Sequence, residues 1–123
     1  MKLNEAITRS DDLKPNDYSI DEKVEWLSRL DGRIRIEIID NHEGAGEGEF
    51  VPYEFGRDQE AELIVPFPYD DIYIHWLHAQ IDYANGEIYK YNNCMAMFNS
   101  LLQTFSDYYK RTHTPKQKGW KFF

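Results

Sequence analysis

The feature that most limits the fold of this chain is a run of helical periodicity between Tyr69 and Thr112. Apolar residues recur at helical spacing in two successive segments, at about residues 69–91 and 93–112. The first segment is apolar over much of its circumference, which indicates a central helix. Its apolar stripe consists of Ile74, Leu77, Ile81, Ala84, Ile88 and Tyr91, and three more apolar residues widen this stripe: Ile72, Trp76 and Tyr83.

The second segment carries a narrow packing seam in a 3-4-3-4 spacing, formed by Met95, Phe98, Leu102, Phe105 and Tyr109. The junction at residues 91–93 is short, so the two segments form either a hairpin or one long helix. The last helix should stop near residues 112–114, because Thr114 precedes Pro115 and a residue before proline disfavours helical angles. We expect the two segments to form the core together. Phe98, Leu102 and Phe105 of the second segment should pack against four residues of the first: Trp76, Leu77, Ile81 and Ile88.

Two further helices are expected before this pair. The first covers about residues 3–13 and stops before Pro15. The second begins after Ser19, a suitable N-cap, and ends near Asn41. Gly32 lies within it and marks either close packing or a break. Residues 42–68 show no helical periodicity and form a long connection. Within it we expect a short strand at residues 61–65.

Composition narrows the class of protein. The chain has 123 residues, enough for one domain, and a net charge of −8, which argues against general nucleic-acid binding. Residues 108–123 nevertheless contain five Lys or Arg and no acid. A single cysteine excludes an internal disulfide and suits a cytosolic setting, and we expect neither a signal peptide nor a membrane span. The sequence thus predicts an all-α bundle at 1–114, with one possible β element, and an extended arm at 115–123.

Candidate catalytic and metal-binding residues are few. His75 and His78 share a helix face and would hold a metal only with a third ligand such as Asp71 or Asp82. Asp70 with Asp71 could form an acid–base pair, but acids at a helix start explain both residues with no further assumption. Cys94 would need a histidine partner to act as a nucleophile. No glycine pattern resembles a phosphate cradle, so we expect no catalytic residue, no metal and no cofactor.

The last residues, KQKGWKFF, combine aromatic side chains with lysines. They either pack back on their own domain or dock on a partner, where aromatic side chains are favoured anchors. In the second case the binding residues would be Lys116, Lys118, Trp120, Lys121, Phe122 and Phe123.

Three stretches carry a resemblance to a known family: VPFPYDDIY, IDYANGEIYKYNN and YYKRTHTP. With the opening NEAITRSDDLKPNDYSIDEKVEWLSRLDGRI, they resemble the head–tail connector proteins, also called adaptor or head-completion proteins, of tailed phages and prophages of Gram-positive bacteria. The resemblance covers most of the chain except about residues 44–60 and the final residues. The family has no active-site motif to compare.

The resemblance implies a structural virion protein, not an enzyme, made in the host cytoplasm. Its partners would be its own copies in a ring, commonly of twelve, then the portal protein, the next tail-completion protein and the DNA that slides through. Acids of the long loop would line the channel or contact a neighbouring copy: Glu43, Glu47, Glu49, Glu54 and Asp58. The alternatives are a non-viral or host-directed helical interaction protein, and a metal-dependent hydrolase using His75 and His78.

Overall fold

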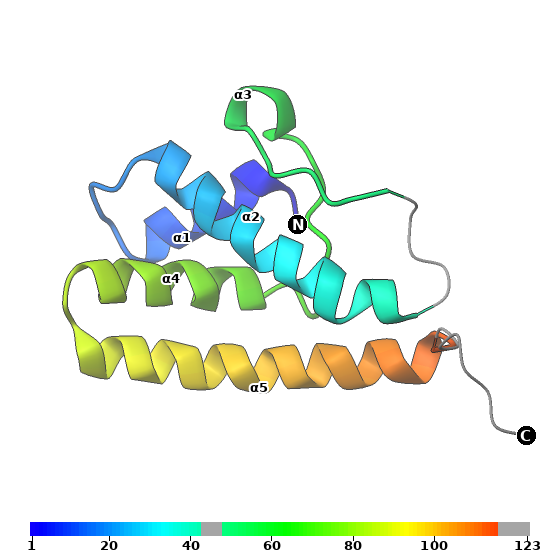
Figure 1. The fold of residues 1–123 in the computed structure, drawn as a ribbon. Coiled ribbons are helices and arrows are strands. Elements are labelled where there is room, and N and C mark those ends of the chain that lie inside the picture. Colours follow the sequence, from blue (N-terminus) through cyan, green and yellow to red (C-terminus); the bar gives the residue numbers. More distant parts are fainter. Residues whose placement is uncertain (43–47, 116–123) are drawn as a thin grey trace, which may run out of the picture.

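The computed structural model describes residues 1–42 and 48–115. The helices follow in the order α1 (Leu3–Leu13), α2 (Ile20–Glu37), η1 (Ile39–Asn41), α3 (Phe55–Asp58), α4 (Ile72–Ala84) and α5 (Ile88–Thr112), and the described part contains no β-strand. Helix α4 lies between α5 on one side and α1 and α2 on the other (Figure 1). The predicted all-α class is therefore confirmed.

Helix α1 has the bounds that the sequence predicts. It turns Leu3, Ala6 and Ile7 into the core. Its N-terminal end is tied to the connecting segment by backbone hydrogen bonds, from the Leu3 amide to the Ala61 carbonyl at 2.9 Å and from the Leu63 amide to the Met1 carbonyl at 2.9 Å. Residues 61–65 form no strand, and only an isolated bridge joins Lys2 to Glu62.

Helix α2 starts as expected, because the Ser19 hydroxyl accepts a hydrogen bond from the Glu22 amide at 3.1 Å. It ends at Glu37, and the single turn of η1 then carries the chain to Asn41. Gly32 does not break the helix. A Cβ atom there would lie 3.3 Å from the ring of Phe50, so close packing of the connecting segment explains the glycine.

Helices α4 and α5 form a hairpin, which decides between the two arrangements that the sequence allows. The expected turn at residues 91–93 is wrong, because the chain reverses at Asn85, Gly86 and Glu87 (Figure 1). Gly86 has a φ of 75°, and the Glu87 amide bonds back to the Asp82 carbonyl at 2.9 Å. This is the helix-ending motif that glycine favours, because its left-handed angles strain other residues. Helix α5 therefore begins five residues earlier than predicted.

The core extends from α1 and α2 through α4 to the α5 seam. Phe98, Phe105 and Tyr109 are buried, and the rings of Trp76 and Phe98 lie 5.1 Å apart between centroids. Met95 and Leu102 are only partly buried at the rim. The prediction for Ile88 is wrong, since the displaced turn leaves its side chain 53% exposed. The predicted end of the last helix is confirmed, because α5 stops at Thr112.

Candidate assembly surface

A buried carboxylate in α2 holds the connecting segment against the helix. Asp31 accepts hydrogen bonds from the hydroxyls of Tyr53 and Tyr73, each at 2.6 Å, and from the Ile64 amide at 3.1 Å. The Tyr73 hydroxyl in turn accepts from the Val65 amide at 2.8 Å. Three groups are thus bound directly to one fully buried side chain, and Val65 is fixed through the Tyr73 hydroxyl.

Burial dominates the electrostatics of this cluster. It raises the pKa of Asp31, although the three donated hydrogen bonds oppose the shift. Burial and the neighbouring carboxylate also raise the pKa of Tyr53 and of Tyr73. Asp31 is fully buried, and its hydrogen bonds to Tyr53 and Ile64 position the connecting segment on α2. Sequence reasoning missed it, although Asp31 interrupts the apolar stripe of Leu27 and Ile34, which signals a buried polar contact.

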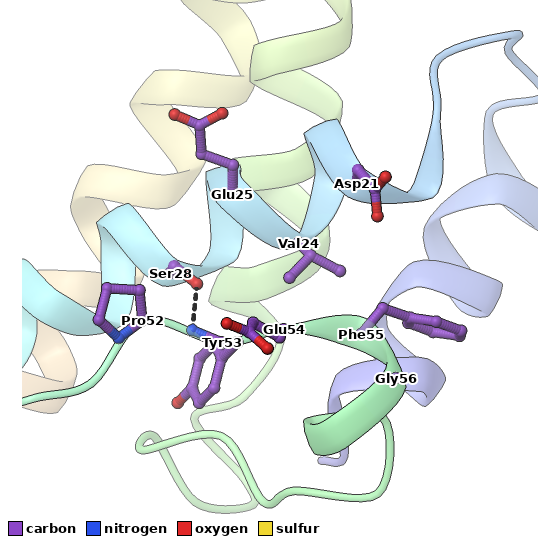
Figure 2. A pocket seen from close by; sticks show the side chains of 9 residues that line it. All are labelled: Asp21, Val24, Glu25, Ser28, Pro52, Tyr53, Glu54, Phe55 and Gly56. Carbon is purple, nitrogen blue, oxygen red and sulfur yellow. Dashed lines mark hydrogen bonds between the residues drawn. The ribbon is translucent and has the colours of Figure 1, made fainter.

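The segment fixed in this way borders a first hollow at the start of α2. Figure 2 shows it between α2 and residues 52–56, with the Ser28 hydroxyl accepting a hydrogen bond from the Tyr53 amide at 2.8 Å. Its volume is about 460 Å³. Asp21, Glu25 and Glu54 are among its lining residues, so it would repel a phosphate or carboxylate ligand.

A second, larger hollow of about 690 Å³ follows along α2. We call it the α2 groove, and it is lined by Glu25, Ser28, Arg29, Gly32, Arg33, Ile36, Phe50, Pro52, Trp76 and Gln80. Ile36 is 67% exposed at its edge, and Val51 of the adjoining segment is 64% exposed. Large apolar side chains gathered around an open groove are typical of a surface that another protein covers.

Two of the candidate metal ligands have other partners. His78 turns to α1, where its Nε2 lies 3.2 Å from the Ser10 carbonyl oxygen, and burial lowers its pKa. Both Asp82 oxygens lie 2.7 Å from the Lys14 ammonium. No group of three or more His, Cys, Asp or Glu side chains suited to a metal occurs in residues 1–42 and 48–115.

The other two catalytic candidates are also engaged elsewhere. The Cys94 thiol donates a hydrogen bond to an Asp82 oxygen at 3.5 Å, and burial raises the pKa of Cys94, which disfavours the reactive thiolate. Asp70 is buried, with a carboxylate oxygen 3.4 Å from the Met1 amino group, whereas Asp71 is exposed. The two acids therefore have separate surroundings.

Two of the predicted acidic loop residues lie beside the same cation. Glu54 and Asp58 flank Arg57, whose guanidinium lies 2.8 Å from Asp58 and 3.8 Å from Glu54. Hydrogen bonding to Arg57 lowers the pKa of Asp58. Glu49 is exposed. The remaining predicted positions lie outside the described residues: Glu43, Glu47, Lys116, Lys118, Trp120, Lys121, Phe122 and Phe123.

Comparison of the chain with protein-family models, with curated proteins and with solved structures gives no match. No helix in the described ranges combines the length and apolar character needed to cross a membrane. The fold and the surface thus define an all-α helical protein with an open groove lined partly by apolar side chains.

Proposed function

We propose that this protein is a phage head–tail connector, a structural subunit that assembles in a ring on the portal and continues the DNA channel. The proposal rests on the sequence resemblance, and the structural observation that carries it is the α2 groove with its exposed apolar edge. A subunit without a catalytic site needs a surface of this kind, because contacts with neighbouring proteins are its only activity.

The groove has the composition of a protein-binding surface. Ile36, Phe50 and Pro52 supply apolar and aromatic area, which is what the centres of protein interfaces use as anchors. Arg29 and Arg33 lie at its rim, paired with Glu25 at 2.7 Å and Glu37 at 3.7 Å. A ring requires two different surfaces that fit each other, and the groove would be one of them.

The net charge of −8 is consistent with a channel subunit. DNA binds proteins mainly through phosphate contacts with Lys and Arg, so an acidic wall lets the duplex slide. The acidic loop and the basic tail remain predicted contacts with neighbouring copies and with the portal.

The test is binding to the portal protein encoded with this chain. Wild-type protein should co-migrate with the portal as a ring of several copies, measured by native mass spectrometry. Ile36→Asp should weaken this complex by about tenfold or more, because it places a charge at an apolar interface. Leu13→Asp is the matched control, since Leu13 is also 67% exposed and also lies in the last turn of a helix, α1.

Two results would contradict the proposal. If wild-type protein does not bind the portal, the alternative of a host-directed or non-viral interaction protein replaces it. If Ile36→Asp and Leu13→Asp behave alike, the α2 groove is not the surface that assembles.

A further inference from the structure

The outer side of α5 is exposed and free of charge over its central turns. Within α5 only Phe98, Phe105 and Tyr109 are buried, all on the side that meets α4. Residues 91–106 contain no Asp, Glu, Lys or Arg, although 29% of the whole chain is charged. Loss of charged residues from an exposed face is characteristic of the centre of a protein interface.

The exposed residues of this side include a second 3-4-3-4 series. We call it the outer seam, and it consists of Lys90, Asn93, Met97, Ser100, Thr104 and Asp107, all exposed. This spacing is the one with which two helices pack along their length. The single large apolar member, Met97, is 53% exposed.

The outer seam is complementary to itself in one orientation. If a second α5 lies antiparallel, with the two-fold axis between Phe98 and Asn99, then Met97 faces Ser100 and Asn93 faces Thr104. In this register Lys90 faces Asp107 of the second copy, and the two-fold symmetry repeats the pair. A parallel arrangement would instead set Lys90 against Lys90.

The end charges are able to make these contacts. The Lys90 ammonium lies 3.4 Å from Glu87 of its own chain, and a lysine has three donors, so it can bind a second carboxylate. Asp107 accepts one hydrogen bond, from Gln103 at 2.9 Å, and keeps acceptor capacity. The small side chain of Ser100 leaves room for Met97 of the other copy.

We propose that the free protein forms an antiparallel two-fold dimer through the outer seam of α5. The pair is weak, because one methionine is the only large apolar residue of the seam, and its Kd should lie in the range of about 10 to 100 μM. A two-fold pair closes on itself, whereas a ring joins different surfaces, so assembly on the portal would replace it.

The experiment is sedimentation equilibrium of the full chain from about 1 μM to 1 mM, a range that spans this Kd. Lys90→Glu and Asp107→Lys should each raise the Kd about tenfold, since each places like charges opposite one another twice, and the double variant should restore it. Ser100→Glu should abolish dimerisation. Asn92→Glu adds the same charge on the exposed side of α5 but outside the seam, so it should leave the Kd unchanged.

Circular dichroism of each variant confirms that the helices are retained. A monomer over the whole range, or a mass far above a dimer in the absence of portal, would overturn the proposal. So would a Ser100→Glu dimer as stable as wild type. A double variant no tighter than Lys90→Glu would refute the register.

Discussion

Removing the hydroxyl of Tyr73 tests how the connecting segment is held. In Tyr73→Phe the Asp31 carboxylate loses a 2.6 Å hydrogen bond, and the Val65 amide loses its 2.8 Å acceptor. A hydrogen bond to a charged group contributes about 1.5–3 kcal/mol, and a buried amide left without a partner costs about 1–3 kcal/mol. Because the two effects overlap at one site, we expect a loss of about 3–4 kcal/mol in unfolding free energy.

Tyr53→Phe is the matched control, because it removes one 2.6 Å hydrogen bond to the same carboxylate from a less buried ring. It should cost about 1.5–2 kcal/mol. Urea unfolding followed by circular dichroism gives both values, with an unchanged slope showing that the folded and unfolded states are comparable. If Tyr73→Phe costs no more than Tyr53→Phe, the segment does not depend on the shared hydroxyl and the reasoning fails.

Four other outcomes are expected. Burial raises the pKa of Asp31 in the folded protein above its ordinary 3.8. The contribution of Asp31 to the free energy of unfolding therefore falls as pH rises from about 4 through the pKa of the folded state. Asp31→Asn should remove this pH dependence, measured by urea unfolding. Gly86→Ala should cost about 1 kcal/mol in thermal unfolding, because no atom lies within 4 Å of an added Cβ and only the strained φ of 75° matters. Leu102→Ala should cost about 2 kcal/mol in urea unfolding, the low end for such changes, since Leu102 is only partly buried. Deleting residues 116–123 should leave the melting temperature nearly unchanged but weaken portal binding, and a sharp drop in melting temperature would place the tail in the domain's own core.

Helix boundaries and helix faces could be predicted where neighbouring residues alone determine them. Ser19 signals the start of α2, and the spacing of Phe98, Phe105 and Tyr109 identifies the inner face of α5. The hairpin turn was misplaced because the apolar stripe was extended through Ile88 and Tyr91. The Asn85–Gly86 pair was the stronger signal, since a left-handed glycine ends a helix regardless of the apolar residues beyond it.

The candidate surfaces depend on contacts between distant parts of the chain, which periodicity does not reveal. Asp31 and Tyr73 are 42 positions apart, and Gly32 meets Phe50 only after the segment has folded back over α2. The exposure of Ile36 and Val51 likewise depends on what the rest of the chain leaves uncovered. The lack of charge in residues 91–106 was visible in the sequence, but its meaning depends on knowing which side of α5 is exposed.

The central position of α4 determines how the molecule comes apart. Eight of its residues are buried, against neighbours contributed by α1, α2 and α5 together: Ile72, Tyr73, Ile74, Trp76, Leu77, Ala79, Ile81 and Asp82. Separating α4 from α1, α2 or α5 exposes part of this surface to water, so the opening of any one of these neighbours weakens the packing of the others. Unfolding should therefore be a single cooperative event, with the amides of α4 exchanging with solvent only at the rate of complete unfolding.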